Sequence, residues 1–114
     1  MNSRSPKGPS SLRGGATRAE LREDVEALSA LADETRYTLA REIAGRDSPT
    51  VGALTESVEV SDSAVSHALA DLRAAGLVTS DVDGRRRRYE ATSRLRWLLA
   101  ALDTTRGSDG GGPR

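Results

Sequence analysis

Residues 60–91 read VSDSAVSHALADLRAAGLVTSDVDGRRRRYEA, and the spacing of their apolar residues changes at Gly76. Before this glycine, apolar residues recur every three or four positions, which is typical of an amphipathic helix. After it they alternate along two short runs separated by Asp83-Gly84, a dipeptide that favours a type I′ turn. The stretch therefore predicts a helix over about 61–75, followed by a β-hairpin over 77–91.

A shorter helix is predicted directly upstream of this one. Thr50 can cap a helix over about 51–58, and Ser61 can cap the longer helix that follows. Only Glu59 and Val60 separate the two helices, so they cannot lie parallel, and such a pair is the sequence form of a helix-turn-helix. A helix-turn-helix that continues directly into a hairpin is the winged-helix arrangement, in which the hairpin is the wing.

Three further amphipathic helices flank this region. A first helix is predicted over 18–31, a second begins after the capping residue Asp33 and stops at Gly45, and a last one begins after Thr92 or Ser93. The apolar stripes of the first and last helices consist of Leu21, Val25, Leu28 and Leu31 and of Leu95, Leu98, Leu99 and Leu102. The predicted fold is therefore mainly α with a small β-hairpin, in the order ααααββα.

The composition limits both the size of the domain and its chemistry. Both ends of the 114-residue chain are rich in Gly, Ser, Pro and Arg, so we expect disordered tails over 1–17 and 105–114 around one domain over 18–104. A domain of this size buries so little apolar surface that it is only marginally stable alone. Association with a second copy would bury more of that surface. Cysteine is absent, which excludes disulfides, thiolate metal sites and a cysteine nucleophile.

The sequence also argues against a membrane protein and against an enzyme. No apolar run approaches the roughly 20 residues that cross a bilayer, and the N-terminus lacks the apolar segment of a signal peptide, so we expect a cytoplasmic protein. No serine and aspartate arrangement is evident around His67. The Gly-rich C-terminal stretch does not follow a strand and open a helix, as a phosphate-binding loop would. We expect no catalytic residues and no cofactor.

The charges are unevenly distributed although the formal net charge is zero. Residues 1–19 carry four basic and no acidic side chains, whereas residues 20–103 hold 11 basic and 16 acidic ones. Four consecutive arginines, residues 85–88, interrupt this acidic stretch at the predicted wing. A basic cluster on an acidic body is typical of a surface that binds a polyanion, although a solvated charge run without a partner has the same sequence.

Three segments together resemble the ArsR-like winged-helix regulators. They are LSALADETRYTL at 28–39, VSDSAVSHALADLRAAGLVT at 60–79 and DGRRRRY at 83–89. The resemblance covers about residues 20–103 and implies a homodimeric, repressor-type protein that binds a palindromic operator in double-stranded DNA, often under the control of an effector. No effector is indicated by the sequence. The resemblance also implies a dimer interface on the first and last helices, here Leu21, Val25, Leu28, Leu95, Leu98, Leu99 and Leu102.

The predicted helix over 61–75 has an apolar and a polar face. Its core side consists of Val65, Ala68, Leu69 and Leu72. If the other side enters the major groove, the candidate DNA contacts are Ser61, Ser63, Ser66, His67, Ala70 and Arg73, together with Arg85, Arg86, Arg87 and Arg88 on the wing. The helix face lacks side chains that make bidentate contacts with guanine or adenine, so much of the affinity would come from phosphates. Local capping and solvation are the alternative roles for the serines.

His67 is the one histidine of the chain, and three roles are open to it. A tetrahedral metal site would need further ligands, but the chain has no cysteine and no second histidine. Metal-sensing members of the resembling family bind their ions on the third helix or on the last helix. At those positions this chain has only residues 51–54 and 98–103, so we do not extend the resemblance to metal sensing. A contact with a phosphate or a base is favoured over an exposed side chain without a partner.

Two residues depart from the family's usual pattern. Glu59 occupies a turn position where relatives usually place Gly, which predicts a strained residue with φ > 0. Arg88 stands where relatives often have Tyr or Val, which predicts a more basic wing.

The alternative to a DNA-binding regulator is a winged-helix module that binds another protein through its arginines. Adjacent guanidiniums match duplex phosphates more closely than most protein surfaces, which favours DNA.

Overall fold

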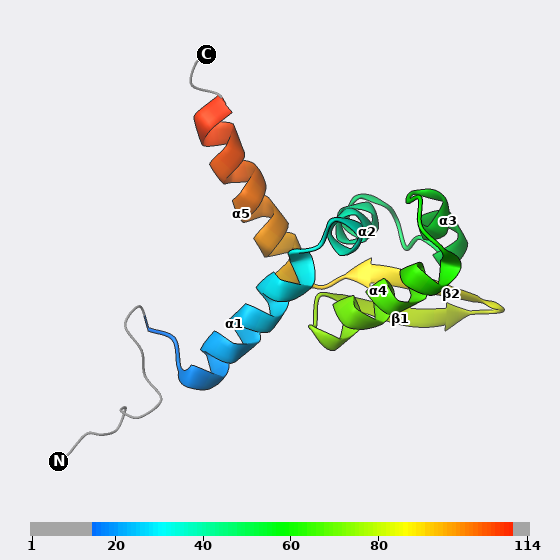
Figure 1. Cartoon of the computed structure of the whole chain (residues 1–114), viewed down its shortest axis with the longest axis horizontal. Coiled ribbons are helices and arrows are strands. Elements are labelled where there is room, and N and C mark those ends of the chain that lie inside the picture. The colour runs from blue at the N-terminus through cyan, green and yellow to red at the C-terminus, as the bar shows by residue number, and fades with distance from the viewer. Residues whose placement is uncertain (1–14, 111–114) are drawn as a thin grey trace.

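A computed structural model describes residues 15–110 of the chain, and within them the elements follow the predicted order (Figure 1). These elements are α1 (Arg18–Leu31), α2 (Glu34–Gly45), α3 (Val51–Glu56), α4 (Asp62–Ala74), β1 (Val78–Asp83), β2 (Arg86–Ala91) and α5 (Ser93–Gly110). The two strands pair antiparallel. The mainly helical winged helix-turn-helix predicted from the sequence is confirmed.

The predicted capping residues begin the helices as expected. The side chains of Asp33, Thr50 and Ser61 accept hydrogen bonds from the backbone N–H three residues later, at 2.9, 3.2 and 3.1 Å. Of the two candidates before α5, the structure assigns the role to Thr92, whose Oγ1 accepts from Leu95 N at 3.3 Å. The same hydroxyl lies 3.0 Å from Leu77 O, which joins the start of α5 to the start of the wing.

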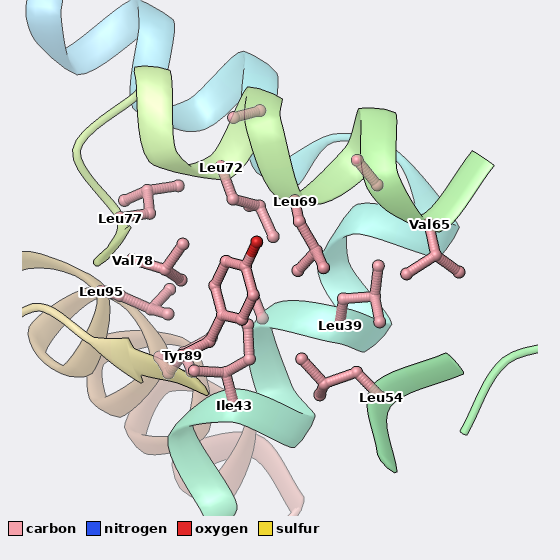
Figure 2. Packing of buried hydrophobic residues seen from close by; sticks show 14 of the residues in the cluster. Leu39, Ile43, Leu54, Val65, Leu69, Leu72, Leu77, Val78, Tyr89 and Leu95 are labelled. Carbon is pink, nitrogen blue, oxygen red and sulfur yellow. The ribbon is translucent and has the colours of Figure 1, made fainter. Parts of the chain in front are cut away.

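The core lies between α2, α4 and the wing (Figure 2). Leu39 and Ile43 of α2 face Leu69 and Leu72 of α4, and all four are fully buried or nearly so. The ring of Tyr89, from β2, lies among these side chains and fixes which face of the hairpin is turned inward. Because β2 is held through this ring, the wing has a defined position beside the helix-turn-helix.

The molecule has two distinct ends (Figure 1). Helices α1 and α5 project from one end, whereas α3 and the tip of the hairpin lie at the other. Ion pairs join the projecting helices to each other and to α2, from Arg94 to Asp24 at 2.6 Å and from Arg41 to Asp103 at 3.1 Å. The projecting ends of α1 and α5 therefore lie away from α3 and the tip of the hairpin, although α1 also packs against α4.

Helix α5 is longer than the sequence predicted. The expected domain ended at residue 104, but α5 continues to Gly110. A hydrogen bond from Thr105 Oγ1 to Ala101 O at 2.8 Å and an ion pair between Arg106 and Asp103 follow the helical spacing through this extra turn. Of the tails predicted over 1–17 and 105–114, residues 1–14 and 111–114 lie outside the described residues. Thr17, predicted to belong to the first tail, caps α1 instead, and its Oγ1 accepts from Glu20 N at 3.0 Å.

The predicted strain at Glu59 is wrong. Among residues 15–110, the one non-glycine residue with positive φ is Ser48, at 48°, in the loop between α2 and α3. Helix α3 ends at Glu56, and the backbone N–H of Ser57 bonds to Leu54 O at 3.0 Å. The connection to α4 is thus longer than the two residues inferred from the sequence, so Glu59 does not have to adopt a left-handed conformation to make the turn.

Candidate nucleic-acid interface

Helix α4 turns its apolar side to the core and its polar side to solvent, as predicted. Val65, Leu69 and Leu72 are at most 1% exposed. The predicted contact residues of this helix are all exposed, namely Ser61, Ser63, Ser66, His67, Ala70 and Arg73. The exposed side therefore presents three serines, counting the capping residue Ser61, and one histidine around its first two turns, in the position that a groove-reading helix requires.

The register of the hairpin sorts the four wing arginines onto two faces. Asp81 lies opposite Arg88 and Val82 lies opposite Arg87. Since side chains alternate along a strand, Arg87 shares the face of buried Tyr89, and Arg86 and Arg88 share the other face. Arg85 lies in the turn between the strands. The arginines are therefore not equivalent, although they are adjacent in sequence.

Arg85, Arg86 and Arg87 are exposed and line a groove of about 650 Å³ with the start of α3. The other lining residues are Thr50, Val51, Gly52, Ala53 and Glu56. Three arginines border the first turn of a helix that has no basic residue of its own, and they make an electropositive trough with Glu56 as its one carboxylate. Arg87 Nη1 also donates to Ser80 Oγ at 3.0 Å. Such a trough suits an extended anion such as a nucleic-acid backbone.

The contacts of Arg88 reach beyond the wing, whereas Arg87 Nη1 donates to Ser80 Oγ within the wing at 3.0 Å. The side chain of Arg88 is 36% exposed. Nε donates to Asp83 Oδ2 at 3.0 Å, and Nη1 donates to the backbone carbonyl of Ser48 at 2.8 Å. Its guanidinium is already engaged within the protein, by a carboxylate on the wing and by the loop before α3.

That loop acts as a short third strand beside the wing. Tyr89 N donates to Pro49 O at 3.0 Å, and Thr50 forms a β-bridge with Arg88. Ser48 Oγ donates to Glu90 Oε2 at 2.8 Å. Sequence reasoning missed this pairing because the loop shows no strand pattern, and its few backbone contacts involve residues some 40 positions away.

The opposite end of the molecule carries exposed apolar residues on α1 and α5. They are Leu21, Val25, Leu28, Trp97 and Leu102, and Trp97 is 76% exposed. The inclusion of Leu95 and Leu99 in a dimer interface needs correction, because they are 0% and 6% exposed within the protomer. Both point into the protomer's own core, so they have almost no surface left to bury against a partner.

Trp97 was absent from the predicted interface, although its sequence position offered a signal. It lies two residues after Leu95, about 200° around the helix, and therefore outside the stripe that the leucine spacing defines. A tryptophan on the outer side of a helix is a costly exposure of apolar surface. Nearby, an apolar hollow of about 240 Å³ is bordered mainly by Leu28, Leu31, Tyr37, Leu98 and Leu102.

The ion pair between α2 and α5 perturbs both of its members. The hydrogen bond from Arg41 lowers the pKa of Asp103, and the hydrogen bond to Asp103 raises the pKa of Arg41. Arg41 Nη1 also donates to the hydroxyl of Tyr37 at 3.0 Å. These contacts fix the direction in which α5 leaves the body of the protein.

Within the described part of the chain, no three residues among His, Cys, Asp and Glu lie together as a group that could hold a metal ion. His67 is exposed on α4. None of the helices between residues 15 and 110 combines the length and the apolar character that spanning a membrane requires.

The sequence profile described as bacterial regulatory protein, arsR family, matches residues 33–80. Two proteins of Halobacterium salinarum are similar to most of the chain. One, named as a candidate arsenical resistance operon repressor, ArsR, is 48% identical over 88 residues, which cover 75% of this chain and 67% of that protein. The other, similarly named ArsR2, is 46% identical over 86 residues, which cover 75% of this chain and 72% of that protein.

Solved structures of regulators share the fold. NolR from Sinorhizobium fredii superposes with a TM-score of 0.71 at 28% identity, covering 94% of this chain and 98% of that one. An ArsR-like transcriptional regulator from Rhodococcus sp. RHA1 superposes with a TM-score of 0.63 at 30% identity, covering 80% and 85%. The exposed face of α4, the basic wing and these relatives agree, and the chain belongs to the ArsR family as a DNA-binding transcriptional regulator rather than an enzyme.

Proposed function

We propose that the chain is a homodimeric repressor that binds a palindromic operator in double-stranded DNA. In this proposal α4 enters the major groove, and its exposed side chains read base edges. The wing arginines and the start of α3 bind the phosphate backbone. Repression is supported by the names of the two Halobacterium salinarum relatives, both of which are named as candidate repressors of an arsenical resistance operon.

The observation that carries the proposal is the groove between the wing and α3. Three exposed arginines line it, and it lies at the same end of the molecule as the helix-turn-helix. The chain's acidic residues outnumber its basic ones between positions 20 and 103, so this concentration of positive charge is local. A local basic trough on an acidic body favours a polyanionic ligand that reaches this end alone.

The exposed apolar residues of α1 and α5 support the homodimer. Val25 and Leu28 are 53% and 58% exposed, and Trp97 on α5 is more exposed still. Apolar surface of this extent is normally covered by a partner. A second copy of the chain can cover this apolar surface without any other protein, because the same face on both copies can pair about a twofold axis. That axis would present two α4 helices to the two halves of a palindrome.

The effector of this regulator is not a thiolate-bound ion in the proposal. Soft metals and metalloids are held by cysteine sulfur, and the chain has no cysteine. We therefore propose no resident metal or cofactor. A regulator of transcription acts where the chromosome lies, which places the proposed function in the cytoplasm.

A binding titration on the full chain tests the proposal. Fluorescence anisotropy would follow binding to a labelled duplex from the region upstream of its own gene and to a scrambled duplex of equal length, at two salt concentrations. We expect preference for the upstream duplex and a steep fall in affinity with salt. Footprinting would then locate two symmetric half-sites. Equal, salt-insensitive affinity for both duplexes would overturn the proposal in favour of a protein-binding module.

A further inference from the structure

We propose that Arg88 is a positioning residue that locks the wing to the loop before α3, and not a fourth arginine that contacts DNA. The inference rests on the proposed DNA-binding function, because the object that Arg88 positions is the groove between α3 and residues 85–87. The contacts of Arg88 differ from those of Arg87, whose Nη1 donates to Ser80 Oγ at 3.0 Å within the wing, because Arg88 also reaches the loop before α3.

One guanidinium connects two segments that are distant in sequence. Nη1 of Arg88 donates to Ser48 O at 2.8 Å, and Nε donates to Asp83 Oδ2 at 3.0 Å. Ser48 lies two residues before the cap of α3, and Asp83 is the last residue of β1, beside the turn of the hairpin. Arginine can hold both because its donors have a fixed planar geometry, which the single ammonium group of lysine lacks.

The loop that receives Arg88 has a conformation that needs support. Ser48 has a φ of 48°, in the left-handed region that non-glycine residues adopt rarely and at a cost in free energy. Three contacts with β2 hold it there: the Arg88 bond to its carbonyl, its own hydroxyl bond to Glu90 at 2.8 Å, and the bond from Tyr89 N to Pro49 O at 3.0 Å. Arg88 supplies the one positively charged group in this set.

The contacts of Arg88 with Ser48 and Asp83, here called the lock, determine how the two sides of the DNA-binding groove are held relative to each other. On one side of it, Thr50 follows Ser48 by two residues, caps α3 and lines the groove. On the other side, Arg86 and Arg87 immediately precede Arg88 on β2 and line the same groove. If the lock opens, the distance between the wing arginines and α3 is no longer fixed. The two sides of the groove then no longer bind one phosphate backbone of the DNA together.

Arg88 also balances the charge of the outer face of the wing. That face, set by the strand register, carries Asp81, Asp83 and Glu90 beside Arg86 and Arg88. The carboxylates would repel a nearby phosphate backbone if a cation were removed from among them. A lysine at position 88 keeps the charge but cannot keep both hydrogen bonds, so the two contributions can be separated by experiment.

The first arm of the test compares two conservative changes on the full chain. Arg88→Lys is measured against Arg22→Lys, a control that makes the same change at an exposed arginine of α1 outside the groove, by anisotropy with the upstream duplex at several salt concentrations. Arg22 belongs to neither α4 nor the wing, so Arg22→Lys should bind like the parent chain, and a phosphate contact at position 88 would likewise tolerate lysine. Arg88→Lys should bind at least about tenfold more weakly than the parent chain. A lysine cannot donate to both Ser48 O and Asp83 Oδ2, so the variant loses at least one of these two hydrogen bonds. Equal affinities of the two variants would overturn the proposal.

The second arm needs no DNA. Hydrogen exchange at the Tyr89 amide, which donates to Pro49 O, reports whether the loop stays paired with β2. We expect Arg88→Lys and Arg88→Ala to accelerate exchange there by about tenfold, and Arg22→Lys to leave it unchanged. Thermal unfolding followed by circular dichroism checks that each variant is folded, and if Arg88→Ala unfolds, the lysine variant carries the measurement.

The outcomes separate the lock from the DNA-binding function itself. If the parent chain fails to bind the upstream duplex, the proposed function is lost, but the exchange arm still decides whether Arg88 holds the loop. Unchanged exchange in both Arg88 variants would overturn the lock. Accelerated exchange with undiminished DNA binding would show that the lock exists but does not position a DNA-binding groove, which would also overturn the proposal.

Discussion

At the scale of single residues, the exposed face of α4 offers few groups that can distinguish one base pair from another. Ser63 and His67 lie one turn apart on that face, and both are exposed. A hydroxyl and an imidazole can each make one hydrogen bond to a base edge, but neither makes the bidentate contact with which arginine reads guanine. Sequence preference should therefore be modest and concentrated in these two side chains.

Replacing Ser63 or His67 by alanine should relax the choice among operator variants. Each lost base contact should reduce discrimination by roughly 1–3 kcal/mol, and the dependence of affinity on salt should stay nearly constant. Binding titrations against a set of single-base operator variants, repeated at two salt concentrations, measure both quantities. Ala70→Ser, on the same exposed side, serves as a control that adds a hydroxyl. A change in salt dependence without a change in preference would assign these residues to phosphates instead.

At the scale of elements, the wing should contribute affinity without sequence preference. Changing Arg86 and Arg87 to alanine removes two cations from the groove beside α3. Binding should weaken on all sequences alike, and the slope of log affinity against log salt should fall by about one unit for each lost phosphate contact. Because α4 has so few specific donors, we expect this pair of changes to cost more affinity than Ser63→Ala or His67→Ala. Loss of preference equal to that of the α4 variants would contradict this division.

The ion pair that orients α5 should make stability depend on pH in the acid range. The pKa of Asp103 is lowered below its ordinary value of 3.8 by the hydrogen bond from Arg41. A group whose pKa is depressed in the folded state stabilises the fold above its unfolded pKa, and this contribution is lost as the pH falls through the folded value. The difference in Tm between the parent chain and Asp103→Asn should therefore be constant near neutrality and shrink below about pH 4.

Thermal unfolding at a series of pH values measures that difference. Asp81→Asn, which changes an exposed carboxylate on the wing, is a control for the loss of one negative charge. A difference between the parent chain and Asp103→Asn that stayed constant through the acid range would mean that the pair with Arg41 does not form in solution. The size of the effect is expected to be small because Asp103 is exposed and its interaction is screened by water.

The elements could be predicted from the sequence because their signals are local. Caps such as Thr50 and Ser61, and the change of period at Gly76, depend on neighbours within a few positions. The role of Arg88 could not be predicted, because the same residue type repeats four times and only the pairing with Ser48 distinguishes it. Leu95 and Leu98 lie on one stripe, and the sequence does not show which part of that stripe the protomer itself buries.

At the scale of the whole molecule, the separation of the two ends governs how the regulator would work. The apolar surface on α1 and α5 and the basic groove beside α3 lie at opposite ends of the protomer (Figure 1). A partner can therefore cover the first without blocking the second. Joining two protomers makes the second half-site contact intramolecular, which multiplies the affinity for a palindrome by orders of magnitude.

We accordingly expect the full chain to be a dimer at tens of micromolar, and Leu28→Asp to make it monomeric. Leu28 is 58% exposed, so a charge there can be solvated in the monomer and is costly only when a partner covers it. Leu99 is unsuited to the test, because it is buried in the protomer and a charge there would unfold it. Sedimentation equilibrium measures the mass, and the unfolding temperature confirms that the variant is folded.

Trp97 provides an independent readout of the same event, since it is the one tryptophan of the chain and is 76% exposed in the protomer. If a second copy covers it, its emission should lie at shorter wavelength in the dimer and shift to longer wavelength on dilution or in Leu28→Asp. The monomeric variant should also bind the full operator far more weakly, yet bind a single half-site duplex almost as well as the parent chain. A parent chain that is monomeric in sedimentation, with emission unchanged on dilution, would remove the dimer from the proposed function while leaving the wing and α4 to be tested separately.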